Sequence, residues 1–331
     1  MFLRDECDSC GECLIQCPFV EYDRERAVAE WNRLLAGESA PILSACATCA
    51  ACNEICPQGA NPFDLIVELQ EKTGALNVSD EMKEMFSAMC RAKTKVTPGD
   101  LDRPALSVCV VRRSFPHDVK GRPFEGMTMI RGEDYFCQLG WLHLGMVKPV
   151  REGIGTFIKN LAALGHKEIV FVHDDCYTAA TAVARDLGVE VPFRPIHVVE
   201  YLRDWLKEHT REVKPLGMKI AYQRPCASRW TPEKEPLVDE VLELIGAERV
   251  ARKYDRENAL CCAFPLMVTD PQRAFGYKNK NIEDAKAHGA EALATLCPLC
   301  YQSLAPVVSE HGLPAYTLID LVRLALGENL D

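Results

Sequence analysis

The sequence lacks an excess of positive charge and has no long apolar run. Its 331 residues carry a formal net charge of −10, which argues against nucleic acid or an anionic membrane surface as the main partner. The longest apolar runs, such as ALSVCVV at 105–111, are far shorter than the roughly 20 residues that span a bilayer. No apolar segment follows Met1, so we expect no signal peptide. We therefore expect a cytoplasmic protein with no membrane span of its own, which reaches a membrane only through a partner subunit.

Cysteine, by contrast, is abundant. The chain contains 17 cysteines, a number that indicates either disulfides in an oxidising compartment or metal sites in a reducing one. Because we expect no signal peptide, metal sites are the better interpretation.

Two motifs near the N-terminus share the spacing C-x2-C-x2-C-x3-C-P. Three closely spaced thiolates can each bind a different iron of one cubane, whereas the displaced fourth ligates the other cluster. The motifs therefore predict two [4Fe-4S] clusters. One is bound by Cys7, Cys10, Cys13 and Cys56, and the other by Cys46, Cys49, Cys52 and Cys17. Zinc and disulfides are the alternatives, but zinc sites use paired C-x-x-C knuckles rather than triplets with a displaced fourth cysteine.

Two helices are predicted around the second motif. Within residues 20–39, Ala27, Trp31, Leu34 and Leu35 fall on one helical face. Within residues 61–74, Asn61 is the expected N-cap, Pro62 the first helical residue and Gly74 the end. Residues 1–78 resemble the helical two-cluster ferredoxin modules of succinate dehydrogenase and heterodisulfide reductase, which implies an all-α electron-transfer module.

Residues 79–104 are polar and end in TKVTPGDLDRP, which contains the breakers proline and glycine. We expect an interdomain linker there, and we interpret its Cys90 as a spare thiol.

The rest of the chain repeats one pattern at a fixed offset. Each of the following pairs is separated by 124 positions: Gly165 and Gly289, His173 and Cys297, Cys176 and Cys300, Gly188 and Gly312, and Cys137 and Cys261. This indicates a duplicated domain, which we divide at 105–212 and 213–331. Strand-like runs such as ALSVCVV at 105–111 and EIVFV at 168–172 alternate with helical runs in both copies, and this alternation predicts α/β domains with parallel sheets. The expected fold class is α+β multidomain.

The second copy contains a single cysteine, an adjacent pair and a C-x-x-C. This order and spacing resemble the CCG cysteine-rich domain of heterodisulfide reductases. The resemblance implies that the five thiolates hold a catalytic, non-cubane [4Fe-4S] cluster, whereas some copies in the family hold an ordinary cluster or zinc. The five are Cys226, Cys261, Cys262, Cys297 and Cys300. The alternative is a set of buried structural thiols. The sequence departs from the family pattern at Ala263, where the family has glycine, and at Gln223 in QRPC, where the family has HDPC.

The first copy has an incomplete set of ligands. Cys109, Cys137, His173 and Cys176 remain, and Gln138 replaces the second cysteine of the pair. Three cysteines and one histidine could bind zinc tetrahedrally, or the site could be an empty relict. A second five-cysteine cluster is excluded by the number of ligands.

The order of a ferredoxin module and two CCG domains resembles fused iron–sulfur proteins such as the D subunit of heterodisulfide reductase, the sulfite-reduction-associated K subunit and the glycolate oxidase iron–sulfur subunit. This resemblance implies an enzyme that relays electrons to the five-cysteine cluster and cleaves or forms a disulfide. Its expected partners are a flavoprotein or a membrane cytochrome b. The alternative is an electron-transfer subunit between a flavin dehydrogenase (of a hydroxy acid or glycerol phosphate) and quinone. A redox-sensing structural protein is a weaker third hypothesis.

Four basic residues lie near the five cysteines in sequence: Arg229, Arg273, Lys278 and Lys280. They could bind an anionic substrate, but we favour the interpretation that they are solvated surface charges.

Overall fold

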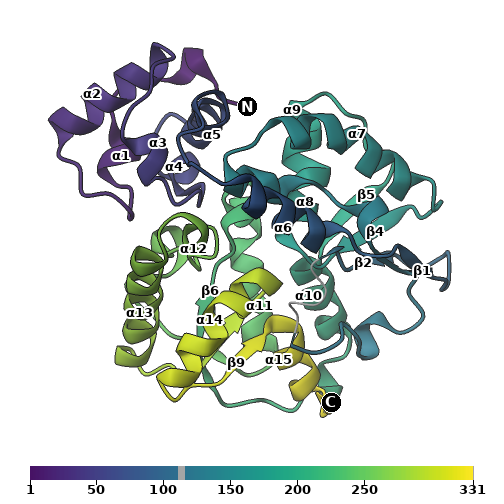
Figure 1. The fold of residues 1–331 in the computed structure, drawn as a ribbon. Coiled ribbons are helices and arrows are strands. Elements are labelled where there is room, and N and C mark those ends of the chain that lie inside the picture. The colour runs from purple at the N-terminus through teal and green to yellow at the C-terminus, as the bar shows by residue number, and fades with distance from the viewer. Residues whose placement is uncertain (111–115, 331) are drawn as a thin grey trace.

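The computed structural model describes residues 1–110 and 116–330 (Figure 1). The first 90 residues form helices without strands: α1 (Glu12–Ile15), α2 (Arg24–Leu35), α3 (Ile42–Ala45), α4 (Ala51–Ile55), α5 (Pro62–Thr73) and α6 (Asp80–Cys90). The expected helical face of α2 is correct, because Ala27, Trp31 and Leu34 are buried. The assignment of this region as a ferredoxin module stays a prediction.

The start of α5 differs in detail from the expectation. Pro62 and Gly74 lie at the predicted ends of the helix, but Asn61 has a φ of 54° and its side chain makes no capping bond. Asn53 takes that role instead, because its Oδ1 accepts a hydrogen bond from the Phe63 backbone N–H at 2.8 Å. Because this capping residue belongs to the preceding helix, α4, the sequence next to α5 could not reveal it.

The first sheet contains β1 (Lys95–Thr97), β2 (Ala105–Ser107), β3 (Met129–Arg131), β4 (Glu168–Phe171) and β5 (Arg194–His197) in the order β1-β3-β2-β4-β5. Strands β2 to β5 are parallel, as expected for an α/β fold. The expected strand at 105–111 ends earlier in the structure, at Ser107, and its last residue, Val111, lies outside the described residues. Helices α7 (Lys148–Ala162), α8 (Asp174–Thr178), α9 (Ala184–Asp186) and α10 (Val198–Glu208) accompany this sheet.

The segment 79–104 is more than a linker. It contains α6 as well as β1, which pairs antiparallel with β3 and so corrects the expectation of a purely parallel sheet. The polar composition of β1 suits its place at the edge of the sheet, where one side faces no other strand of the sheet.

The second sheet has the order β7-β6-β8-β9 and is parallel throughout. Its strands are β6 (Lys219–Gln223), β7 (Glu248–Arg249), β8 (Ala292–Thr295) and β9 (Ala315–Thr317). Its helices are α11 (Glu235–Leu244), α12 (Leu266–Thr269), α13 (Pro271–Ala287), α14 (Pro298–Glu310) and α15 (Leu318–Ala325). The first sheet contains the same arrangement: its strands β3-β2-β4-β5 correspond in order to β7-β6-β8-β9 of the second sheet. The interpretation that a duplication produced this likeness stays a prediction.

One hydrophobic core joins the two α/β halves. It contains Val170 and Leu202 of the first half together with Ile220 and Val241 of the second, all fully buried, and α10 packs against α11. The helices α1–α5 form a separate group at one corner, near α12 and α13 (Figure 1). This arrangement fixes the cysteine motifs of all three parts relative to one another.

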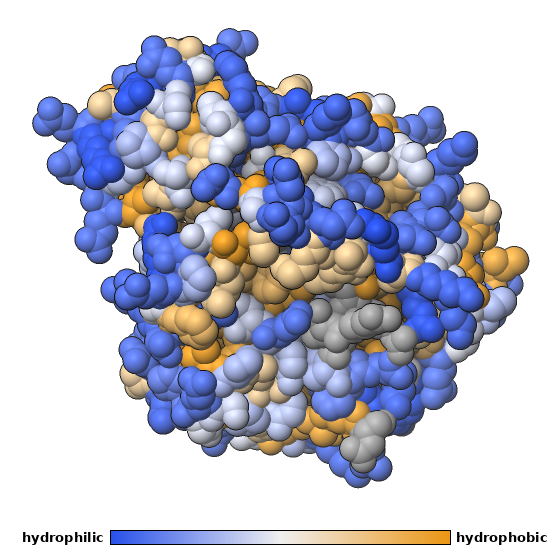
Figure 2. All heavy atoms as spheres, viewed as in Figure 1, coloured by the Kyte–Doolittle hydropathy of each residue, from blue (hydrophilic) through white to orange (hydrophobic). Residues whose placement is uncertain are grey.

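Hydrophilic side chains cover most of the face shown in Figure 2, with hydrophobic residues in small patches. Among the helices of the described residues, none combines the length and the apolar character that crossing a bilayer requires.

Candidate metal centres

The two four-cysteine motifs form equivalent loops. In the first, Ser9 and Gly11 have positive φ values of 63° and 75°. In the second, Thr48 and Ala50 occupy the same motif positions with φ values of 51° and 56°. Left-handed backbone is unfavourable for residues other than glycine, and its recurrence at matching positions shows that the two loops share one tightly curved shape.

The displaced fourth cysteine of each motif lies beside the opposite triplet. Burial raises the pKa of Cys13, and the nearby charges of Cys56, Cys10 and Cys7 raise it further. Burial likewise raises the pKa of Cys46 to about 12, with Cys17 contributing in the same direction. The structure thus brings together the two sets of four cysteines that the spacing predicted. We call Cys7, Cys10, Cys13 and Cys56 the first four-cysteine group, and Cys46, Cys49, Cys52 and Cys17 the second.

Backbone and indole N–H groups face sulfur in both groups. Trp31 Nε1 donates to Cys7 Sγ at 3.2 Å, and the Thr48 backbone N–H donates to Cys46 Sγ at 3.3 Å. Hydrogen bonds to cluster sulfurs help to set reduction potentials. The sequence placed Trp31 on a buried helix face but gave no sign of its contact with Cys7, because that contact is made across the fold.

The five cysteines of the second half converge at the carboxyl ends of β6 and β8, where open α/β sheets place their sites. Cys226 lies just beyond β6, and Cys297 caps α14 directly after β8. Cys300 follows in the first turn of α14, while Cys261 and Cys262 precede α12. We call these five residues the five-cysteine group.

Contacts between neighbouring sulfurs link the whole five-cysteine group. Cys226 Sγ lies 3.4 Å from Cys261 Sγ, well beyond a disulfide bond length of about 2.05 Å. Hydrogen bonds from Cys261 and Cys300 lower the pKa of Cys262. A hydrogen bond from Cys300 lowers the pKa of Cys297, an effect opposed by burial and supported by His173. The group therefore holds reduced sulfur, with Cys262 and Cys297 favoured as thiolates, and suits a thiophilic metal.

The two departures from the family pattern have structural explanations. The buried Gln223 donates from Nε2 to the Leu260 carbonyl at 2.8 Å and accepts from Asn281 Nδ2 at 2.7 Å, so it fixes the loop that carries the cysteine pair. Ala263 has a φ of 56° and is fully buried. This is the region that favours glycine, so alanine retains the loop shape at a cost in strain.

The interpretation of the four basic residues as surface charges is wrong for two of them. Lys280 is exposed, but Arg229 and Lys278 are buried. Lys278 lies near the cysteine pair: burial lowers the pKa of Lys278 overall, and the nearby charges of Cys262 and Cys261 only partly oppose this shift. No carboxylate among the described residues pairs with Lys278, and its Nζ lies 5.3 Å from the centroid of the Phe275 ring.

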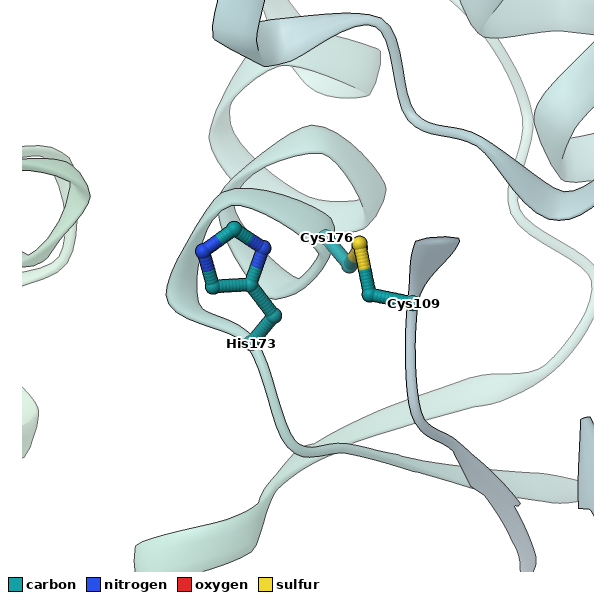
Figure 3. A group of neighbouring side chains, drawn as sticks. All are labelled: Cys109, His173 and Cys176. Carbon is teal, nitrogen blue, oxygen red and sulfur yellow. The ribbon is translucent and has the colours of Figure 1, made fainter. Parts of the chain in front are cut away.

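The first half brings a smaller set of donors together at the ends of β2 and β4. One ligand atom each from Cys109, His173 and Cys176 lies within 4.8 Å of the others (Figure 3). The fourth predicted member, Cys137, hydrogen-bonds to Cys176 but falls outside this closest set. Cys90 lies near the set as well: burial raises the pKa of Cys90 to about 12, with further contributions from Cys109 and Cys137. Cys90 lies in α6, within the predicted linker, so sequence spacing could not connect it with the other donors. We call Cys90, Cys109, Cys137, His173 and Cys176 together the first-half group.

A buried ionic network attaches α4 to the five-cysteine group. Glu54 accepts hydrogen bonds from Arg224 at 2.9 and 3.0 Å and also pairs with Arg229. On the other side of the second four-cysteine group, Arg273 donates to the Ala45 carbonyl at 2.9 Å. Burial raises the pKa of Cys49, and the charges of Cys17 and Cys226 raise it further. Cys49 thus lies between its own group and the five-cysteine group.

Comparisons with known proteins agree with these motifs. The family model of the CCG cysteine-rich domain matches residues 220–305. The chain is 22% identical to the D subunit of dihydromethanophenazine:CoB–CoM heterodisulfide reductase from Methanosarcina mazei, over 91% of this chain and 88% of that protein. It is 25% identical to the protein of the same name from Methanosarcina barkeri, over 60% of this chain and 51% of that protein.

A solved structure of a hypothetical protein from Helicobacter pylori has a TM-score of 0.54 and 13% identity, and the match covers 83% of this chain and 59% of that one. At this identity the likeness concerns the fold alone. Together, the family match and the relatives confirm the predicted resemblance: residues 220–305 match the CCG cysteine-rich domain, and most of the chain is similar to D subunits of heterodisulfide reductase.

Proposed function

We propose that the chain conducts electrons through two [4Fe-4S] clusters to a third, catalytic cluster, where a disulfide is reductively cleaved. The first two clusters are assigned to the two four-cysteine groups with crossed fourth ligands, and the third to the five-cysteine group. The single observation that carries this proposal is the packing of Cys17, Cys49 and Cys226 against the hydrophobic cluster that contains the other four cysteines of the five-cysteine group, which makes the second four-cysteine group the neighbour of the five-cysteine group. The two four-cysteine groups are also neighbours of each other. Burial raises the pKa of Cys52 in the second group, and Cys13 of the first group contributes to this increase.

The residues fit such clusters. All eight cysteines of the two motifs and all five of the catalytic site are free thiols, and the soft thiolate is the ligand that iron–sulfur clusters use. When bound, the clusters supply one-electron transfer and iron sites with affinity for sulfur. The chain itself holds Cys262 and Cys297 toward the thiolate form, and it keeps a buried positive charge, Lys278, beside the cysteine pair.

The proposed reaction consumes one disulfide, two electrons and two protons and yields two thiols. The sulfur–sulfur bond breaks, the electrons arrive one at a time through the relay, and the protons come from water. The electron donor is a partner protein, either a flavoprotein or a membrane cytochrome b. The relatives from Methanosarcina are named as CoB–CoM heterodisulfide reductase subunits; for this chain we propose the chemical class of substrate, a disulfide, and no single compound.

For the first-half group we propose a single zinc ion. Its three closest donors lie mutually within 4.8 Å, a compact arrangement that suits one ion with donors at about 2.0–2.3 Å. Cys137 and Cys90 are the two candidates for the fourth ligand.

The test is anaerobic reduction of disulfides by the purified chain with a reduced viologen dye as electron donor. We expect turnover that depends on the disulfide and stops when the five-cysteine group is disrupted. Electron transfer from dye to quinone without disulfide turnover would contradict the proposal and support the role of an electron-transfer subunit.

A further inference from the structure

His173 lies between two sulfur groups that the sequence treats as separate. It lies two residues after the end of β4, occupies the N-cap position of α8 and is 2% exposed. Its Nε2 lies 3.3 Å from Cys297 Sγ of the five-cysteine group. Figure 3 shows that one ring nitrogen faces Cys109 and Cys176 while the other points away from them. The imidazole ring therefore has one nitrogen directed at each group.

The contact joins equivalent positions of the two halves. His173 and Cys297 are 124 residues apart in the chain, follow the corresponding strands β4 and β8, and cap the corresponding helices α8 and α14. A cysteine at position 173 would offer one sulfur and no N–H group to donate to a second sulfur while it binds a metal ion. A histidine has two nitrogens on opposite sides of a rigid ring, so the replacement of cysteine by histidine makes a bridge available.

The roles of the two nitrogens follow from what they face. A neutral imidazole has one N–H donor and one nitrogen with a free lone pair. Nε2 faces the sulfur of Cys297 and lies farther, 3.8 Å, from Asp175 Oδ2. As the donor to Cys297, Nε2 leaves the lone pair on Nδ1. No nitrogen or oxygen of the described residues hydrogen-bonds to Nδ1, and the partners on its side are the sulfurs of the first-half group, so Nδ1 is available to a metal ion there.

The surroundings of His173 favour positive charge on the ring. The Asp175 carboxylate lies 3.8 Å from Nε2, and sulfurs of the two groups lie near the two ring nitrogens. A metal cation bound to Nδ1 would place positive charge next to these negative groups, as a proton on Nδ1 would. Metal-bound histidines usually donate their second nitrogen to an acceptor, which fixes the ring and tunes the site.

We propose that His173 is a positioning residue that binds the ion of the first-half group through Nδ1 and donates a hydrogen bond from Nε2 to Cys297. Through this bond the first-half group holds Cys297 in place and raises the reduction potential of the five-cysteine cluster, because hydrogen bonds to ligand sulfur favour the reduced state. The first-half group is then a structural control element of the reactive site. This inference rests on the proposed function for the presence of a cluster on Cys297.

Two substitutions separate the functions of the two nitrogens. The amide nitrogen of glutamine can take the place of Nε2, whereas asparagine reaches only as far as Nδ1. His173→Gln should therefore lose the zinc but keep the potential of the five-cysteine cluster near the unsubstituted value. His173→Asn should lose the zinc and also shift the reduction equilibrium of that cluster about tenfold toward the oxidised state, which is about 59 mV for a one-electron couple.

The measurements are zinc and iron content and an EPR-monitored redox titration of the complete chain. His166→Gln is the matched control, because His166 is also a buried histidine of the first half but bonds the Arg103 carbonyl at 3.1 Å instead of a cysteine; it should retain zinc and potential. Equal potentials in His173→Asn and the unsubstituted chain, equal shifts in both His173 variants, or an unsubstituted chain without zinc would each overturn the proposal. Iron near eight atoms per chain would instead refute the catalytic cluster, and the proposed function with it.

Discussion

The first-half group and the five-cysteine group occupy corresponding places at the ends of corresponding strands, yet they offer different chemistry. The first gathers three donors mutually within 4.8 Å, whereas the second spreads five thiols in a row from Cys226 to Cys297. The second also has a four-cysteine group as its neighbour, through Cys49. We propose that one strand-end scaffold supports a compact single-ion site in one half and a redox site in the other, depending on a few side chains.

The cysteine pair distinguishes the two sites most strongly, because the residue that corresponds to Cys262 in the first half is Gln138. Cys262→Ser should abolish disulfide turnover, since a hydroxyl is a harder and weaker iron ligand than a thiolate. The two N-terminal clusters should remain reducible by dithionite, as EPR spectroscopy can show. Ser309→Ala, at an exposed position of α14, is the control and should keep turnover. Near-normal turnover of Cys262→Ser would place the chemistry elsewhere.

The five-cysteine group also differs from the first-half group in having a four-cysteine group as its neighbour, and a substitution of Cys17 tests this connection. Cys17→Ala should damage the cluster on Cys46, Cys49 and Cys52, rather than the one on the nearest triplet, and so cut the connection to the five-cysteine group. We expect the loss of about four iron atoms per chain and slow reduction of the catalytic cluster by external donors. A structure of the cluster-loaded protein with Cys17 bound to the same cluster as Cys7 would contradict the crossed assignment.

Glu54 of α4 connects the second four-cysteine group with the five-cysteine group, because it pairs with Arg224 and Arg229. Glu54→Gln should destabilise the fold by about 3 kcal/mol, because Arg224 and Arg229 would keep buried charges without their shared partner. Chemical unfolding under anaerobic conditions measures this loss. Glu68→Gln is the control: it removes a largely exposed pair with Arg151 and should cost less than about 1 kcal/mol.

The Glu54 network also predicts a pH dependence. Burial raises the pKa of Glu54, but Arg229 and Arg224 lower it more, so it lies below its usual value of 4.5 in the folded chain. A depressed carboxyl pKa stabilises the fold fully above about pH 4.5, and the contribution is lost as the pH falls through the folded pKa. The glutamine variant should lack this part of the acid sensitivity, and an unchanged acid profile would show that the network contributes little.

Lys278 provides a smaller difference between the halves, since its counterpart 124 positions earlier is the buried Ile154. Lys278→Met should lower the reduction potential of the five-cysteine cluster, because a nearby positive charge favours the added electron. Redox titration monitored by EPR gives the shift. Lys280→Met, on the exposed side of the same helix, should leave the potential unchanged, and equal effects of both variants would exclude a specific role for Lys278.

The sequence predicted the features that depend on local order along the chain. The cysteine triplets, the parallel strands and the helix from Arg24 to Leu35 follow from spacing over a few residues, and so they could be predicted. Contacts between distant segments could not. Cys90 enters the first-half group from a segment interpreted as a linker, and Trp31 reaches Cys7 across the helical region. Lys278 looked like a surface charge because its helix carries many polar residues, and only the packing of α13 shows that it is buried.

The most direct test of this account is the metal content of the anaerobically purified chain. Three clusters and one zinc ion predict about twelve iron atoms, a similar amount of acid-labile sulfide and about one zinc per chain. About eight iron atoms would contradict the central claim, because it would leave the five-cysteine group without the cluster to which the relay is proposed to lead.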